Sequence, residues 1–120
     1  MRILLVNKFW WRKGGVEDHA FMLKRVFEER GHEVVPFAMA DAANRPTTYD
    51  NYFPSQVEFR TGGVKQKASA AMRATLGWET IRNLRHLLDD VSIDAAHVLH
   101  AYHQLGTTFL RLLERRGIPT

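Results

Sequence analysis

The sequence predicts an α/β protein with a Rossmann-like parallel sheet between two layers of helices, and three observations predict it. Apolar runs that suit buried strands lie at residues 2–7, 32–38 and 92–100. Apolar residues at helical spacing follow the first run, and a second such pattern precedes the third run. Strand, glycine-containing loop, helix and strand follow one another within residues 2–38, which is the order of a βαβ unit.

The first predicted strand is RILLVN, residues 2–7, a continuous apolar run bounded by polar residues. Such a run is typical of a strand that is covered on both faces of a parallel sheet. Helical spacing of apolar residues follows at Val16, Ala20, Leu23 and Phe27. Gly31 supplies a left-handed stop for this helix, and HEVVPFA follows as the second strand.

The remaining residues predict a loop, two helices and two strands. Residues 41–63 are rich in Asn, Pro, Thr, Tyr and Gly, which favours a long loop, and residues 64–90 predict a helix with a break near Gly77. SIDAAHVLH, residues 92–100, predicts the third strand. The next helix is marked by Leu105, Phe109, Leu112 and Leu113 and ends before Gly117. GIPT then predicts the start of a fourth strand, so we expect the three-layer domain to be incomplete.

Composition excludes several classes of protein. With 45% hydrophobic and 25% charged residues, the 120-residue chain has the composition of one globular domain. No stretch approaches the roughly 20 apolar residues that span a bilayer. MRILLV also lacks the longer apolar region and cleavage site of a signal peptide, so we expect a cytoplasmic protein. The absence of cysteine excludes a disulfide framework, a thiolate nucleophile and a Cys-type zinc site.

The net charge of +4 favours a partner with negative charge, and the basic excess is concentrated between Arg60 and Arg85. This segment suits peripheral contact with the inner face of an anionic membrane, although a solvated helix face is the commoner explanation. No RNA-recognition or helix-turn-helix signature is present, so we expect no nucleic acid partner.

Gly14 and Gly15 lie between the first strand and the first helix. Glycine lets the backbone approach a ligand closely, and the N–H groups of the following helix then point at that ligand, which suits a phosphate. The pair lacks the full GxGxxG or Walker pattern, and the plainer alternative is a tight strand-to-helix turn. The neighbouring cations Lys8, Arg12 and Lys13 favour the phosphate.

Trp10 and Trp11 lie in the same loop. Two adjacent indoles cannot both point inward from one loop without distortion, so we expect one of them to be exposed. An exposed indole beside the glycines would suit stacking on a sugar or a base.

Three histidines recur every third residue near the end of the third predicted strand: His97, His100 and His103. On a strand this spacing divides them between both faces, and no nearby carboxylate completes a metal set, so we expect no metal. His97 is either a substrate contact or a buried, hydrogen-bonded strand residue. His100, His103 and Gln104 lie at the carboxyl end, where ligands bind in parallel sheets. We therefore take His100 and His103 as candidate catalytic residues and Gln104 as a substrate contact.

Two long segments carry a further signal. Residues 1–34, MRILLVNKFWWRKGGVEDHAFMLKRVFEERGHEV, contain a GGxE pattern that ends at Glu17, and residues 92–120 read SIDAAHVLHAYHQLGTTFLRLLERRGIPT. Together they resemble the amino-terminal region of family 4 glycosyltransferases of the GT-B fold, which has the GGxE motif and a segment around HLHNIYHQLSPSIL. Where members often have His-x-His-Asn, this chain has Leu99 and His100 in place of the second His and the Asn.

The resemblance implies retaining transfer of a sugar from a nucleotide-sugar donor to a saccharide or lipid acceptor, with no further cofactor. Gly14 and Gly15 would approach the donor diphosphate. The residues that would contact substrate are Trp10, Trp11, Lys13, Glu17, His97 and Gln104. Residues 1–120 would form the amino-terminal, acceptor-side domain, truncated and without the carboxyl-terminal donor-binding domain, so we expect the chain alone not to catalyse transfer.

Two alternatives of other classes stay open. The first is a non-catalytic α/β binding module for an anionic membrane or nucleic acid, and it predicts binding that weakens steeply with salt. The second is self-association of the fragment, because an incomplete sheet leaves an exposed edge that needs cover.

Overall fold

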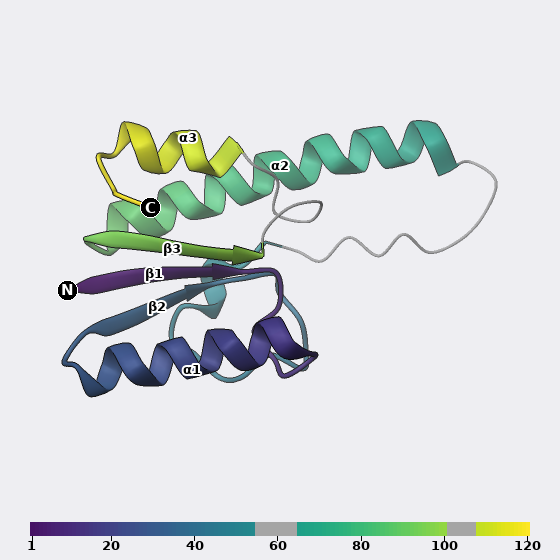
Figure 1. Ribbon diagram of the computed structural model, residues 1–120. Helices are drawn as coiled ribbons and strands as arrows, with labels where there is room; N and C mark the ends of the chain where they lie inside the picture. Colours follow the sequence, from purple (N-terminus) through teal and green to yellow (C-terminus); the bar gives the residue numbers. More distant parts are fainter. Residues whose placement is uncertain (55–64, 101–107) are drawn as a thin grey trace.

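The computed structural model describes residues 1–54, 65–100 and 108–120, and over residues 65–77 and at residue 100 it describes the backbone alone. Its sheet has three parallel strands in the order β2-β1-β3 (Figure 1). These strands are β1 (Arg2–Asn7), β2 (Glu33–Phe37) and β3 (Ala95–His100). The first three of the predicted strands and the parallel α/β fold are therefore confirmed.

The central strand β1 is buried along its length, from Ile3 to Asn7. Leu4 is in register with Val35 of β2 on one side and with Ala96 of β3 on the other. The neighbouring strands and the helices cover β1 on every side. A strand buried on both faces needs apolar residues throughout, and β1 accordingly shows no alternation of apolar and polar residues.

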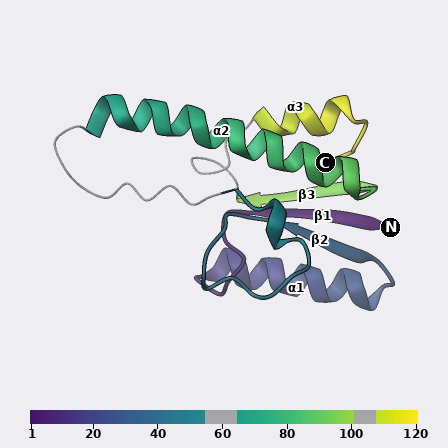
Figure 2. The same cartoon turned by 180° about the vertical axis from the view of Figure 1, so that it is seen from behind.

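Helices cover both faces of the sheet, as Figures 1 and 2 show from opposite sides. The helix α1 (Gly15–Glu29) lies on one face, and α2 (Lys65–Asp90) and α3 (Thr108–Arg115) lie together on the other. Leu84 and Leu87 of α2 and Leu113 of α3 join the strands in one hydrophobic core. None of the described helices is long and apolar enough to cross a membrane.

Two predictions about the helices are wrong. Val16, expected on the buried stripe of α1, is 43% exposed, because the first turn of α1 extends past the carboxyl ends of the strands (Figure 1). The break expected near Gly77 does not occur, and α2 continues through this residue to Asp90. One glycine inside a helix costs only about 1 kcal/mol, less than the loss of the hydrogen bonds on either side of a break.

Glycine ends two helices, as predicted. Gly31 after α1 and Gly117 after α3 have φ angles of 85° and 69°, in the left-handed region that favours glycine. The structure assigns no strand to residues 118–120, where the sequence predicted the start of a fourth. Ala96 N–H nevertheless donates a 2.8 Å hydrogen bond to the Pro119 carbonyl, so this segment runs beside β3.

The loop predicted for residues 41–63 is described as far as residue 54 and contains a short 3₁₀ helix, η1 (Asp50–Tyr52). Leu105, which the sequence placed on the last helix, lies outside the described residues.

Candidate functional site

The carboxyl ends of β1 and β3 lie side by side at one end of the sheet. The loop that joins β1 to α1 begins there. Asn7, the last residue of β1, is in register with His100, the last residue of β3. The chain leaves β1 toward α1 on one face and reaches β3 from α2 on the other (Figure 1). This is the topological switch point of the sheet, the place where ligands bind in open α/β folds.

At this point α1 begins with an exposed amino end. Gly14 precedes the helix with an extended φ of −169°, and among the described residues no side chain caps the first turn. Neither Gly14 nor Gly15 takes the left-handed conformation that favours glycine. A Cβ atom on Gly15 would meet no described residue within 4 Å, and one on Gly14 would meet Glu17 Oε2 at an ordinary 3.7 Å. The turn alone does not account for two glycines, and no described residue fills the space beside Gly15 at the start of the helix.

Two lysines flank this opening. The Nζ atoms of Lys8 and Lys13 lie 4.9 Å and 4.1 Å from the centre of the Phe9 ring, and Lys13 Nζ is 5.8 Å from the Trp11 ring. Within the described residues, neither lysine forms an ion pair. Partial burial lowers the pKa of Lys8, the charge of Lys13 lowers it further, and Glu17 opposes the shift. The two ammonium groups therefore concentrate positive charge beside the amino end of α1, where an anion would be stabilised.

A buried amide and a buried carboxylate join the end of β1 to the start of α1. Asn7 is fully buried and Glu17 is 5% exposed. Asn7 Nδ2 donates to the Phe9 carbonyl at 2.9 Å and to Glu17 Oε1 at 3.4 Å. Asn7 Oδ1 is buried and has no hydrogen-bond partner among the described residues. Glu17 thus lies beside the glycines, and the amide of Asn7 fixes one of its oxygens.

Neither tryptophan is exposed, so the expectation of one exposed indole is wrong. Trp10 is 1% exposed and packs against Phe21 at a ring-centre distance of 4.8 Å. Trp11 is half-buried, lies edge-on to Phe9 at 5.7 Å, and has a buried Nε1 that bonds to no described residue. The loop avoids the expected distortion because its two indoles pack on different partners, and Trp11 retains the more accessible ring.

Asn44 holds this loop from outside, and the sequence reasoning did not single it out. Asn44 Oδ1 accepts a hydrogen bond from the Trp10 N–H at 3.3 Å, and its Nδ2 donates to the Met39 carbonyl at 2.9 Å. The next residue, Arg45, donates its N–H to the Trp10 carbonyl at 2.8 Å. The available signal was the Asn-Arg-Pro sequence, since Asn before a proline-containing turn commonly bonds to nearby backbone.

The histidines are divided. His97 is exposed, lies opposite Leu5 in the sheet, and meets the Phe27 ring edge-on at 6.4 Å. The alternative of a buried His97 is wrong, because β3 is an edge strand of the described sheet and leaves this side chain exposed. His100 is at the ligand edge beside Asn7, and the register shifts between Val6 and Asn7 to place it there. His103 and Gln104 lie outside the described residues.

The fold and the site together define a Rossmann-like α/β domain. Its first helix begins directly after Gly14, and the amino end of this helix lies at the edge of the sheet where ligands bind in such folds. The family model for Glycosyltransferase Family 4 matches residues 13–120. Because the match covers most of the chain, the chain belongs to this glycosyltransferase family, and the three parallel strands are consistent with an amino-terminal domain of the GT-B fold. No curated protein and no solved structure matches significantly.

Proposed function

We propose that the chain is the acceptor-side domain of a retaining glycosyltransferase that moves a sugar from a nucleotide-sugar to a saccharide or lipid acceptor. In this function Gly14 and Gly15 admit the donor diphosphate to the amino end of α1. The observation that carries the proposal is the space at Gly15, which no described residue fills, beside helical N–H groups that no described side chain caps. Membership of the family supplies the reaction class.

The electrostatics support a diphosphate at this position. In sugar transfer, negative charge builds on the departing diphosphate as its bond to the sugar breaks. N–H groups fixed at the start of a helix stabilise that charge without reorganising, and the helix dipole has the same sign. Lys8 and Lys13 add two cations that have no carboxylate partner among the described residues. Partial burial of Lys8 reduces screening by water and strengthens its attraction for an anion.

The acceptor is assigned to the same edge. Glu17 Oε2, beside Gly14, forms no hydrogen bond with a described residue and can accept one from a substrate hydroxyl. His100 ends β3 next to Asn7, and with His103 we propose it as a catalytic residue. Gln104 is a proposed hydroxyl contact. Of the two indoles we assign substrate contact to Trp11, because Trp10 is buried and supports the loop. Substrate contact by His97 stays a prediction, and the position of His97 beside Phe27 does not favour it.

The test is a titration of the isotopically labelled chain with UDP and GDP, followed by backbone amide NMR. Chemical-shift changes are expected at residues 14–17. Gly15→Pro should abolish them, because proline is tolerated at the first helical position but removes the N–H. Gly15→Ala keeps the N–H and places a methyl group in the proposed diphosphate space, so it should also weaken binding. Gly117→Asn, at a distant helix end, is the control, and shifts unaffected by both Gly15 variants would refute the role of the loop.

A second candidate, membrane contact at the inner face of the bilayer, is favoured by one observation on α2. Trp78 is 79% exposed, and Arg82 and Arg85 on the same helix are also exposed. An exposed indole with nearby cations suits the interface of an anionic bilayer. The rest of the predicted basic segment, including Arg60, lies among residues whose side chains are not described. Sedimentation with anionic vesicles should decrease for Trp78→Ala, and equal sedimentation of both proteins would exclude this contact.

A further inference from the structure

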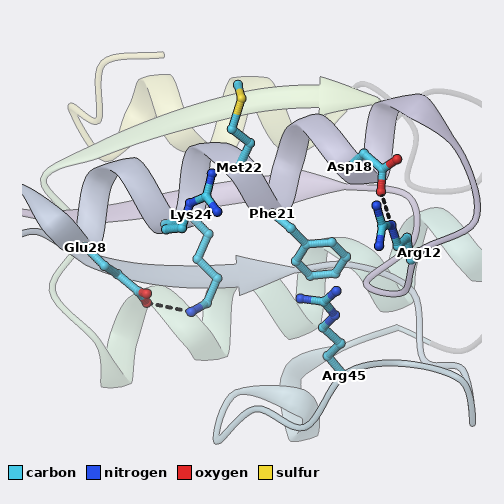
Figure 3. Close-up of a pocket in the computed structure, with 8 residues that line it drawn as sticks. Arg12, Asp18, Phe21, Met22, Lys24, Glu28 and Arg45 are labelled. Carbon is cyan, nitrogen blue, oxygen red and sulfur yellow. Dashed lines mark hydrogen bonds and ion pairs between the residues drawn. The ribbon is translucent and has the colours of Figure 1, made fainter.

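A basic groove runs along the outer side of α1, between this helix and the loop of residues 41–46 (Figure 3). Its volume is about 450 Å³, and its walls include Arg12, Arg25 and Arg45, with Phe21 and Met22 as the apolar part. Neither Gly14 nor Gly15 lines it. Arg25 in its wall is ten residues along the helix from Gly15, or about 15 Å at the rise of an α-helix. The groove is therefore a different site from the one proposed for the diphosphate.

Both carboxylates of the groove already have cationic partners. Arg12 Nε lies 2.5 Å from Asp18 Oδ1, and Lys24 Nζ lies 2.6 Å from Glu28 Oε1. Figure 3 shows these two ion pairs at opposite ends of the groove. Within the described part of the chain, no carboxylate pairs with Arg25 or Arg45. The positive charge between the two ion pairs therefore has no counter-ion among the described residues.

Arg45 is held in place before any ligand arrives. The carbon at the centre of its guanidinium group lies 3.7 Å from the centre of the Phe21 ring, and the group faces that ring in Figure 3. Its backbone is fixed by the 2.8 Å hydrogen bond from its N–H to the Trp10 carbonyl. When a guanidinium group stacks on a ring, the N–H donors at its edges stay free to bind. These donors match two oxygens of a phosphate or a carboxylate. Binding through Arg45 would thus cost less side-chain entropy than binding through a mobile arginine.

We propose that this groove is a second anion site, which binds a phosphate group between Arg25 and Arg45. The group would come from a soluble phosphate ester or from a lipid headgroup, since both present the same oxygens to the two arginines. The site goes beyond the proposed transfer reaction, because it uses neither the glycines nor the edge of the sheet. A phosphate-bearing molecule held there would lie along α1, and the N–H groups at Gly14 and Gly15 would stay available.

Inorganic phosphate is the first probe, titrated into the labelled chain and followed by amide NMR. Chemical-shift changes are expected at Phe21, Met22 and Arg45. Arg25→Ala and Arg45→Ala should each weaken phosphate binding roughly fivefold, as expected for loss of one exposed charge contact. Arg25 has no described hydrogen bond or ion pair, so its variant should fold normally. Arg111→Ala removes an equal charge from an exposed position on α3, and it is the matched control.

The outcomes separate the two anion sites. The groove proposal would be overturned by chemical-shift changes confined to residues 14–17, or by equal affinity in wild type, Arg25→Ala and Arg45→Ala. Neither result would affect the role of the glycine loop, which is the segment of residues 8–14 between β1 and α1. Loss of phosphate binding in both arginine variants but not in Gly15→Pro would establish the groove independently of the proposed function.

The source of the phosphate is distinguished by two further probes. One is glycerol 3-phosphate, and the other is vesicles of phosphatidylcholine with and without phosphatidylglycerol. A defect of Arg25→Ala with the anionic vesicles alone identifies a lipid headgroup, and a defect with glycerol 3-phosphate alone identifies a soluble ester. Absence of a defect with both probes, like equal affinity for phosphate, rejects the site.

Discussion

The Tyr49 hydroxyl donates a 2.6 Å hydrogen bond to Glu33 Oε1 and so ties the loop after β2 back to the start of that strand. Arg2 Nε donates to the other carboxylate oxygen of Glu33 at 2.8 Å. One exposed carboxylate therefore joins β1, β2 and the loop that leads to η1. The loop also carries Asn44 and Arg45, so this contact fixes the far end of the segment that borders the candidate site.

The first prediction is a pH dependence of stability that Tyr49 controls. The hydrogen bond from Tyr49, and next that from Arg2, lowers the pKa of Glu33 from its ordinary 4.5. The contribution of Glu33 to stability is therefore complete above about pH 4.5 and is lost as the pH falls through the folded-state pKa. Hydrogen bonding to Glu33 raises the pKa of Tyr49 above 10.0, so its contribution is complete below that pH and is lost as the pH rises through the folded-state pKa.

Tyr49→Phe should flatten both limbs of a plot of Tm against pH. Tyr52→Phe is the matched control, because Tyr52 bonds to Asp90 Oδ2 at 2.7 Å and its pKa is also raised, chiefly by that bond. It should weaken the basic limb and leave the acid limb of Glu33 intact. An unchanged acid limb in Tyr49→Phe would contradict the assignment.

The second prediction concerns the buried pair at the glycine loop. Asn7→Ala leaves buried Glu17 Oε1 and the Phe9 carbonyl without their donor and should lower the free energy of unfolding by about 2–3 kcal/mol. Asn7→Asp removes the amide donor and sets a second carboxylate against Glu17, so its defect should be larger than that of Asn7→Ala. Urea denaturation measures both, with exposed Asn51→Ala as control. If Asn7→Ala leaves the free energy of unfolding unchanged, the pair of Asn7 and Glu17 does not hold the loop.

The third prediction tests the difference between two glycines. Gly31 has a φ of 85° and no neighbour within 4 Å of a Cβ atom, so Gly31→Ala should cost about 1 kcal/mol through backbone strain alone. Gly15 meets no neighbour and has an ordinary backbone, so Gly15→Ala should leave the folded chain as stable as before or slightly stabilise it. Thermal unfolding of both variants checks the contrast. Equal losses would mean that the loop needs Gly15 for folding and not for ligand access.

The sequence predicted those parts of the fold that depend on local pattern. The apolar run at residues 2–7 became the central strand because parallel sheets cover both faces, and Gly31 ended α1 because the left-handed conformation favours glycine. The start of α1 directly after Gly14 was likewise predicted, because the apolar residues from Val16 onward recur at helical spacing. Each of these features depends on residues that are close in the chain.

Features that depend on distant residues escaped prediction. The exposure of Val16 depends on how far α1 extends past the strands, and the burial of Trp10 depends on Phe21 and on the loop of residues 39–45. No periodicity carries this information. The link between Asn44 and Trp10 spans 34 residues and is visible only after β1 and β2 have paired.

The last prediction is that Asn44 controls the order of the glycine loop. In Asn44→Ala the Trp10 N–H loses its acceptor and the Met39 carbonyl loses its donor, so the Trp10 amide should exchange with deuterium faster and stability should fall by about 1–2 kcal/mol. Asn44→Asp keeps an acceptor for Trp10 but sets a carboxylate against the Met39 carbonyl, so it should protect the Trp10 amide and still destabilise the chain. Hydrogen exchange of Trp10, with Gly31 as an internal reference, separates the two effects. If Trp10 exchanges equally in wild type and Asn44→Ala, the loop is ordered by its own packing on Phe9 and Phe21, and Asn44 has no part in presenting the amino end of α1.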